Sequence, residues 1–223
     1  MRRLLDNWFN ISVFLACGAF VVLGIGDFDA RERLILASGG LLFVHFFEEF
    51  GYPGGFPWIG LHVEMGVTDT DTRSWTLNNL NSLIGNWWFI VVVYAAAFFL
   101  PDVRFLTVAV GVMAVLEVLM HLVGFNIGLR SWYNPGLATA LMLGIVAAAY
   151  FIPAIAASLF TWVDLALALA WVGANYWFVF RSPFYVWTGS KKQFSFPQDE
   201  VLKAQKYIDA CKKRADRKAS QES

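Results

Sequence analysis

The chain has 223 residues, of which 58% are hydrophobic and only 15% charged, and its formal net charge is zero. Soluble globular domains carry about 25% charged residues, so this composition argues against a water-soluble fold. The sequence contains no phosphate-binding loop and no other motif for nucleotides or nucleic acid.

Long stretches of the chain contain no Asp, Glu, Lys or Arg: residues 8–26, 34–44, 82–101, 105–116 and 137–163. A helix needs roughly 20 apolar residues to cross a bilayer. We therefore predict an all-α, polytopic transmembrane helical bundle of about six spans, at residues 8–26, 31–50, 76–100, 102–124, 136–158 and 161–181. The Met-Arg-Arg start has no small-residue cleavage site after its apolar stretch, so we expect a retained first helix rather than a signal peptide.

Two segments differ from these spans. The first half of residues 51–75 is apolar but broken by Gly and Pro, which predicts a short re-entrant or interfacial piece. Residues 191–223 are rich in Lys and Arg and have a narrow apolar stripe, which predicts an amphipathic basic helix, either lying on anionic lipid or solvated. We divide the chain into a transmembrane domain, residues 1–190, and a cytoplasmic basic tail, residues 191–223.

An even number of spans places both termini on one side of the membrane. Basic residues at both ends favour the cytoplasm under the positive-inside rule. We expect an integral membrane protein with both termini cytoplasmic.

Ionisable residues inside spans cost on the order of 3 kcal/mol and need a partner or a purpose. Two such sets are His45, Glu48 and Glu49 in the second span and Glu117 and His121 in the fourth. Both sets lie near the C-terminal ends of spans that run in the same direction, so they share one half of the bilayer. At about 100° per residue, each set can point into the bundle together.

Histidine with a carboxylate three or four residues away is how helical bundles build carboxylate metal sites, and this donor set suits zinc or iron. We take His45, Glu48, Glu117 and His121 as candidate ligands. His62 is a further candidate from the re-entrant piece. A purely structural hydrogen-bond network and a proton or ion pathway through the same acids stay open. The cluster Asn78, Asn79, Asn81, Ser82 and Asn86 either supports the ligands or joins helices.

The motif His45-Phe-Phe-Glu48-Glu49 is followed by His121 and then by Tyr133-Asn-Pro135-Gly136. This order resembles the bacterial membrane-protein family named for its HXXEE motif, which combines H-x-x-E-E with a later histidine and Y-x-P-G. The resemblance covers residues 45–136 and implies that the motif residues form one functional set. It also implies that the membrane is the bacterial inner (cytoplasmic) membrane. The family has no established activity, although its charged residues are generally supposed to be enzymatic.

Three functions fit these patterns. The first is a membrane-embedded metal-dependent enzyme acting on a lipid or other apolar substrate, with Glu49 as general base and Tyr133 as a second catalytic residue. Hydrolysis is favoured slightly over di-iron oxidation, because the sequence has no histidine-rich box of the membrane oxygenase type. The alternatives are an ion- or proton-coupled transporter and an accessory subunit of a membrane complex. The partners that the sequence indicates are the lipid bilayer and an apolar or lipid-like substrate; we expect no nucleic-acid partner, and protein partners are not indicated.

Overall fold

The computed structural model describes residues 2–222, and every regular element within that range is helical. Four crossings are single or nearly single helices, α2 (Trp8–Ile25), α3 (Ala30–Phe50), α9 (Leu137–Ala156) and α10 (Trp162–Phe180). Two crossings are composite, α5–η1–α6 (Asn79–Phe89, Ile90–Ala95, Ala96–Phe99) and α7–η2–α8 (Arg104–Val118, Leu119–Phe125, Asn126–Leu129). The remaining elements are α1 (Arg2–Leu5), α4 (Phe56–Met65), α11 (Pro183–Gly189), η3 (Lys192–Phe194) and α12 (Glu200–Glu222).

Capping residues in the sequence explain where several of these helices begin. Asp29 accepts a hydrogen bond from the backbone of Glu32, whose side chain bonds back to Asp29, and this capping box starts α3. Thr161 and Asp164 make the same reciprocal pair at the start of α10. The all-α prediction is therefore confirmed, with its helices displaced from the expected bounds by only a few residues at most ends.

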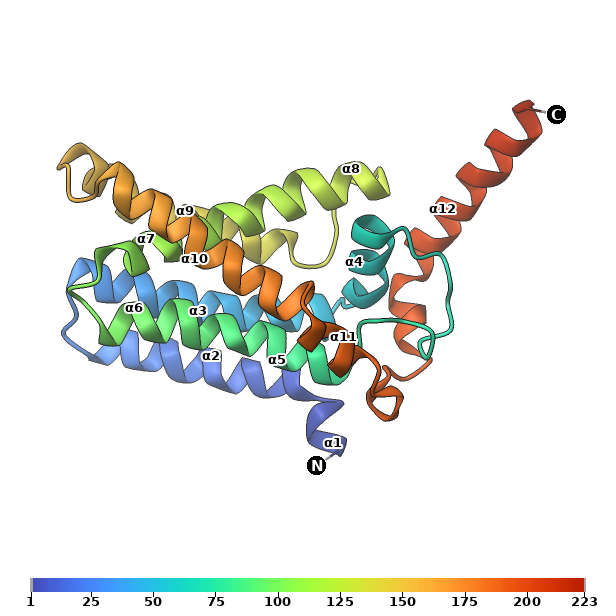
Figure 1. The fold of residues 1–223 in the computed structure, drawn as a ribbon, viewed down its shortest axis with the longest axis horizontal. Helices are drawn as coiled ribbons and strands as arrows, with labels where there is room; N and C mark the ends of the chain where they lie inside the picture. Colours follow the sequence, from blue (N-terminus) through green and yellow to red (C-terminus); the bar gives the residue numbers. More distant parts are fainter. Residues whose placement is uncertain (1, 223) are drawn as a thin grey trace.

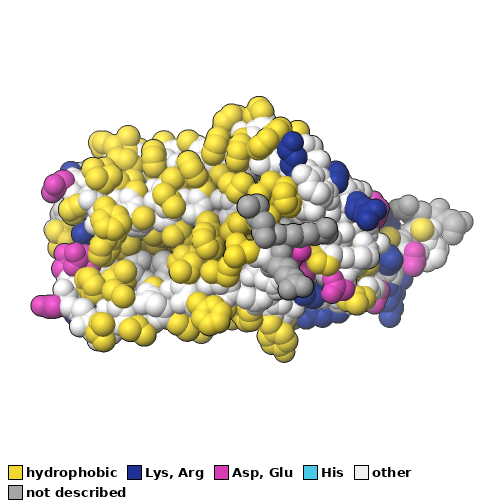
Figure 2. Space-filling view, turned by 90° about the horizontal axis from the view of Figure 1, so that it is seen from below, with side chains coloured by type: hydrophobic (Ala, Val, Ile, Leu, Met, Phe, Trp, Pro, Cys, Tyr) yellow, Lys and Arg dark blue, Asp and Glu magenta, His cyan; other side chains and the backbone are white. Residues whose placement is uncertain are grey.

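The molecule is a membrane protein by the length and composition of its helices. Five helical runs are long and apolar enough to span a bilayer: residues 8–25, 79–99, 104–129, 137–156 and 162–189. The sixth, α3, has charged residues at both ends, Arg31, Glu32 and Arg33 at one and Glu48 and Glu49 at the other. Figure 2 shows one face of the molecule as a broad apolar band with charged side chains gathered at its two ends. About six crossings, as predicted, agree with this arrangement.

Helix α3 lies inside the bundle and positions the site. It packs against α2 on one side and α9 on the other, while α7 packs against α9 and α10. Both termini lie at the same end of the bundle (Figure 1). From its contact with α7, α10 diverges from η2 and α8 towards that end (Figure 1). The polar ends of α3 and α7 line a cavity together with residues of α10.

Both composite crossings contain a π-helical segment, η1 and η2. A π segment widens one turn of an α-helix and occurs frequently at functional sites. His121 lies within η2. The simple four-residue spacing of Glu117 and His121 therefore does not describe a regular α-helical turn.

Helix α12 begins against the body of the protein and then projects from it (Figure 1). Its apolar stripe is buried at Val201, Ala204 and Ile208, and the helix packs against α4. The first half of the stripe therefore contacts protein instead of lipid headgroups or solvent. The side chains of Arg2 and Arg3, used in the orientation prediction, lie outside the described side chains.

Candidate metal centre

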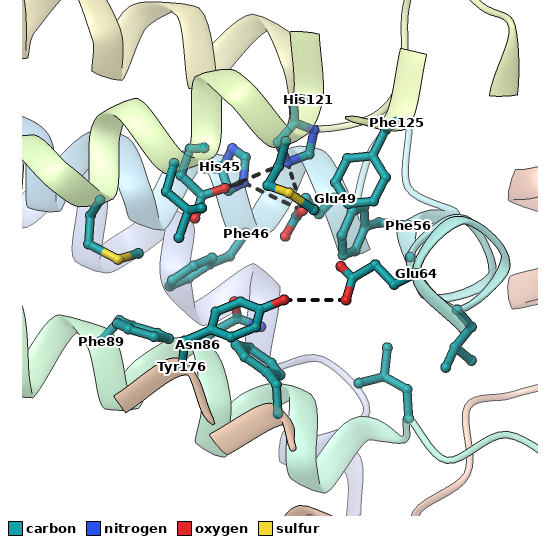
Figure 3. A pocket seen from close by; sticks show the side chains of 18 of the residues that line it. His45, Phe46, Glu49, Phe56, Glu64, Asn86, Phe89, His121, Phe125 and Tyr176 are labelled. Atoms are coloured by element: carbon teal, nitrogen blue, oxygen red, sulfur yellow. Dashed lines mark hydrogen bonds and ion pairs between the residues drawn. The ribbon is translucent and has the colours of Figure 1, made fainter. Parts of the chain in front are cut away.

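Four ionisable side chains from two facing helices converge at the end of the bundle that carries the termini. Nε2 of His45 lies 3.5 Å from Oε1 of Glu49 and 3.5 Å from Oε2 of Glu117. Nε2 of His121 lies 3.3 Å from Oε1 of Glu49 and 3.7 Å from Oε2 of Glu117. Figure 3 shows both imidazoles pointing at the same carboxylates. The predicted juxtaposition of the second and fourth spans is thus present.

Three members of the cluster are almost removed from solvent. His45, Glu49 and His121 are 2%, 4% and 1% exposed, while the Glu117 side chain is about one-fifth exposed. An isolated charge in such a place is costly unless it is paired or bound to a metal. The burial therefore requires that the two carboxylates share cations, whether protons or a metal ion.

The hydrogen bonds around His45 show that its Nδ1 atom carries a proton. The Thr139 hydroxyl donates to Oε2 of Glu48 at 2.6 Å, and its other acceptor within reach is the Gly136 carbonyl. Thr139 Oγ1 can therefore only accept from Nδ1 of His45, which lies 2.8 Å away. Nδ1 therefore carries a proton, and Nε2, which is the ligand atom of a neutral ring, faces the cluster.

His121 is held in the same way by Asn134. Nδ2 of Asn134 donates at 2.8 Å to the His121 carbonyl and at 2.8 Å to Oδ1 of Asn126. Oδ1 of Asn134 is therefore the atom that faces Nδ1 of His121, at 2.6 Å, and it can only accept. Nδ1 donates here too, and Nε2 of His121 also faces the cluster.

This geometry meets the requirements of a metal site. The two Nε2 atoms lie 3.3–3.7 Å from the two carboxylates, farther apart than the roughly 2.7–2.9 Å of a charge-assisted hydrogen bond. All four groups can serve as metal ligands when the imidazoles are neutral. Zn–N bonds of about 2.05 Å place tetrahedral ligands about 3.3 Å apart. His45, Glu117 and His121 each offer a ligand atom within 4.8 Å of the others. A buried group that can hold a metal ion is present, with Nδ1–H bonds of the kind that orient metal-bound histidines.

Glu48, predicted as a ligand, is placed outside this group. Its carboxylate receives hydrogen bonds from the Thr139 hydroxyl, the Thr139 backbone, the Ala138 backbone and the Tyr133 hydroxyl. The first turn of α9 has unpaired N–H groups that favour a carboxylate. Glu48 therefore caps α9 and supports Thr139, which in turn orients His45.

Tyr133, predicted as catalytic, lies in the loop before α9 and points at Glu48 rather than at the cluster. Its hydroxyl donates to Oε1 of Glu48 at 2.9 Å. Burial, followed by the hydrogen bond to Glu48, raises the pKa of Tyr133. The phenol therefore stays a neutral donor near neutral pH and holds Glu48 in place.

Gly136 completes the Y-x-P-G sequence, and it has a backbone reason to be glycine. Its φ is +99°, in the left-handed region that side chains rarely adopt. A Cβ at this position would overlap the imidazole of His121. Gly136 therefore allows the loop to lie directly against a candidate ligand.

His62 and the asparagine cluster lie away from the converging acceptors. His62 bonds to the Val67 carbonyl and to Cys211. Asn78 and Asn81 form the capping box of α5. Of this cluster, Asn86 is the member that lines the neighbouring cavity.

An apolar cavity adjoins the cluster (Figure 3). Its free volume is about 110 Å³, several times the roughly 10–15 Å³ needed for one water molecule. The walls are largely hydrophobic and include Leu42, Phe46, Phe56, Phe89, Met113 and Met120. Across the cavity from the histidines, Glu64 accepts hydrogen bonds from Arg181 at 2.7 Å and from Tyr176 at 3.3 Å. The cluster therefore opens onto an apolar space with one charged pair on its far side.

A protein-family model described as "Protein of unknown function with HXXEE motif" matches residues 37–151, just over half of the chain. The chain belongs to this family. The matched HXXEE segment contains both halves of the cluster and the loop that supports it. No curated protein and no solved structure matches the chain.

The motif that gives the HXXEE family its name contains residues with two different roles in this chain. His45 and the second glutamate, Glu49, face the cluster, whereas the first glutamate, Glu48, faces α9. Sequence reasoning did not identify Thr139 or Asn134 as supports of the histidines. A hydroxyl three residues after Gly136 and an amide within Y-x-P-G are common in helix starts and loops. Their role follows only from the tertiary structure, which places them beside the two imidazoles.

Proposed function

We propose that this HXXEE protein is a membrane-embedded, metal-dependent hydrolase acting on a lipid or another apolar substrate. The observation that carries the proposal is the pair of histidines held through Nδ1, whose Nε2 atoms converge with Glu117 and Glu49 beside an apolar cavity.

In this proposal His45, His121 and Glu117 hold the metal, and zinc is the ion that the donor set favours. Two histidines and one glutamate are a known ligand set of catalytic zinc, which leaves a position for water. A metal in such a site activates its water for attack at neutral pH. Glu49 lies within 3.5 Å of both Nε2 atoms and is placed to accept a proton from that position.

The number of carboxylates favours one metal over two. Carboxylate-bridged di-iron bundles use a glutamate from each of two helices and a Glu-x-x-His motif from each of two others, four carboxylates in all. Among the described side chains, Glu49 and Glu117 are the only carboxylates that contact these histidines. Glu48 is occupied by the start of α9. This count supports hydrolysis over di-iron oxidation.

The cavity supports an apolar substrate. Its phenylalanine, leucine and methionine walls provide little hydrogen bonding along the chain of a substrate, and methionine adapts to irregular shapes. The polar groups lie at the cluster and at the Glu64–Arg181 pair. A substrate with one polar, hydrolysable group on an apolar body matches this distribution.

We further propose that both termini and the metal centre face the cytoplasm. The cluster lies at the end of the bundle that carries both termini (Figure 1). The tail at that end is rich in Lys and Arg, which the positive-inside rule places on the cytoplasmic side.

The first experiment is metal analysis by inductively coupled plasma mass spectrometry of the detergent-purified full chain. We expect near-stoichiometric zinc in the parent, loss in His45→Ala, His121→Ala and Glu117→Gln, and retention in Glu49→Gln. His62→Ala is the matched control, because it removes a histidine outside the cluster, and it should keep the metal. Loss of hydrolytic activity in Glu49→Gln with metal retained would distinguish a base from a ligand.

Other outcomes would change the proposal. Iron in place of zinc would favour oxidation over hydrolysis. A parent protein that takes up no metal, even after reconstitution with several divalent ions, would overturn the enzyme proposal. The buried carboxylates would then be assigned to proton or ion transfer, the function of the transporter alternative.

A further inference from the structure

A second group of reactive side chains joins α12 to α4, apart from the metal centre. Sγ of Cys211, on α12, lies 3.4 Å from Nε2 of His62, on α4. Both residues are half-buried. The contact brings a thiol and an imidazole together across 149 residues of sequence.

The imidazole of His62 is oriented as a base towards the sulfur. Its Nδ1 lies 2.9 Å from the Val67 carbonyl, which can only accept, so Nδ1 carries the proton. Its ring stacks on Trp58 with centroids 4.5 Å apart and planes 10° apart. Nε2 therefore has its lone pair directed at Cys211 and can accept the thiol proton.

A cation also contacts the same sulfur. Nη2 of Arg214, one turn along α12, donates to Sγ of Cys211 at 2.9 Å. The thiolate is the nucleophilic form of cysteine, and an adjacent cation stabilises it. A nucleophile, a base and a group that orients the base together form the arrangement of an activated nucleophile.

We propose that Cys211 is an activated thiol that reacts with a small peroxide to form a sulfenic acid. His62 takes the thiol proton, and the thiolate sulfur attacks one peroxide oxygen. The O–O bond breaks, the sulfur loses two electrons to the peroxide, and the departing hydroxide takes the proton from His62 to leave as water. The inference is independent of the metal centre and of the proposed hydrolysis.

The surroundings favour a small oxidant over a bulky electrophile. Cys211 is only half-exposed and packs beside the core, one turn after the buried Ile208. An oxygen added to Sγ would occupy the 3.4 Å gap to Nε2 of His62. Oxidation should therefore weaken the contact between α12 and α4.

The test uses the full chain in detergent with Cys17→Ser, which leaves Cys211 as its single thiol. Oxidation by hydrogen peroxide at pH 7 is followed by intact-protein mass, with a dione reagent to trap sulfenic acid. We expect Cys211 to react at least about tenfold faster than glutathione, and His62→Gln and Arg214→Gln to lose most of that advantage. Unchanged size-exclusion profiles of the variants serve as the folding check.

Alkylation with iodoacetamide at pH 10 measures how accessible the Cys211 thiol is, apart from its activation, because ordinary thiols are also ionised at that pH. All three proteins should then react at similar rates. The proposal is overturned if Cys211 reacts no faster than glutathione at pH 7, if both variants react as fast as the parent, or if the thiol cannot be alkylated at all. An acyl-sized mass already attached to Cys211 in the purified protein would also overturn the assignment to peroxide.

Discussion

Thr139 Oγ1 lies 2.8 Å from Nδ1 of His45 and links this histidine to Glu48, the first glutamate of the HXXEE motif. The hydroxyl proton goes to Glu48, which leaves the oxygen to accept from His45. Glu49, one residue along α3, contacts the other nitrogen of the same imidazole at 3.5 Å. Glu48 thus orients His45 through Thr139 on the Nδ1 side of the ring, while Glu49 contacts the ring on its Nε2 side.

The first prediction concerns this hydroxyl. Thr139→Val removes the acceptor for His45 Nδ1 and should weaken metal binding by about 10–100-fold, the usual effect of losing a group that orients a ligand. Thr139→Ser keeps the hydroxyl and should bind within a few-fold of the parent. Competition with a chromogenic chelator measures both affinities. Equal affinities for Val and Ser would show that Thr139 does not orient the ligand.

The second prediction concerns Gly136, whose missing side chain makes room for His121. Gly136→Ala should destabilise the protein by about 2 kcal/mol from the left-handed backbone alone, and overlap with the imidazole should also remove the metal. Denaturant unfolding in detergent and metal analysis measure the two effects. Gly18→Ala, on α2, is the matched control, because a Cβ there meets nothing within 4 Å. A Gly136→Ala protein that resembles this control would contradict the assigned role.

The third prediction is that metal removal destabilises the bundle. Without a metal ion, only protons on the imidazoles can compensate the two carboxylates, at separations of 3.3–3.7 Å. A ligand present at 100 times its Kd stabilises the folded state by about 2.7 kcal/mol, so a chelator should lower Tm and added zinc should restore it. His121→Ala should unfold at one temperature with or without chelator. A parent Tm that is insensitive to chelation would count against a bound metal.

The fourth prediction is a pH effect at the start of α12. Burial raises the pKa of Glu200, and the charge of Lys203 offsets only part of that effect. The folded state therefore holds this proton more tightly than the unfolded state does. The stability from the protonated form is fully present below the ordinary carboxyl value of about 4.3 and is lost as pH rises through the raised value.

Thermal unfolding between pH 4 and 7 tests this effect, with Glu200→Gln as the comparison. The parent should lose stability relative to the variant as pH rises. At pH 7 the two should differ by no more than about 1 kcal/mol, since the variant also loses an ion pair with Lys203. Parallel pH profiles for the two proteins would show that Glu200 does not titrate in this way.

The sequence alone determined the class of fold and most of the cluster. Charge-free stretches of spanning length predict helices because a bilayer provides no partners for exposed backbone groups. The pairs His45 with Glu49 and Glu117 with His121 could be predicted to converge because helix direction and a four-residue spacing fix their depth and approximate face.

Only the tertiary structure decided which of these side chains face the cluster and which support the histidines. Glu48 and Glu49 are adjacent in sequence, but successive residues of a helix point about 100° apart, so Glu48 meets α9 and Glu49 meets His121 of η2. Likewise, Thr139 and Asn134 support the histidines through hydrogen bonds from another part of the chain. No local pattern encodes such contacts, because they depend on where α9 packs against α3 and on the path of the loop before it.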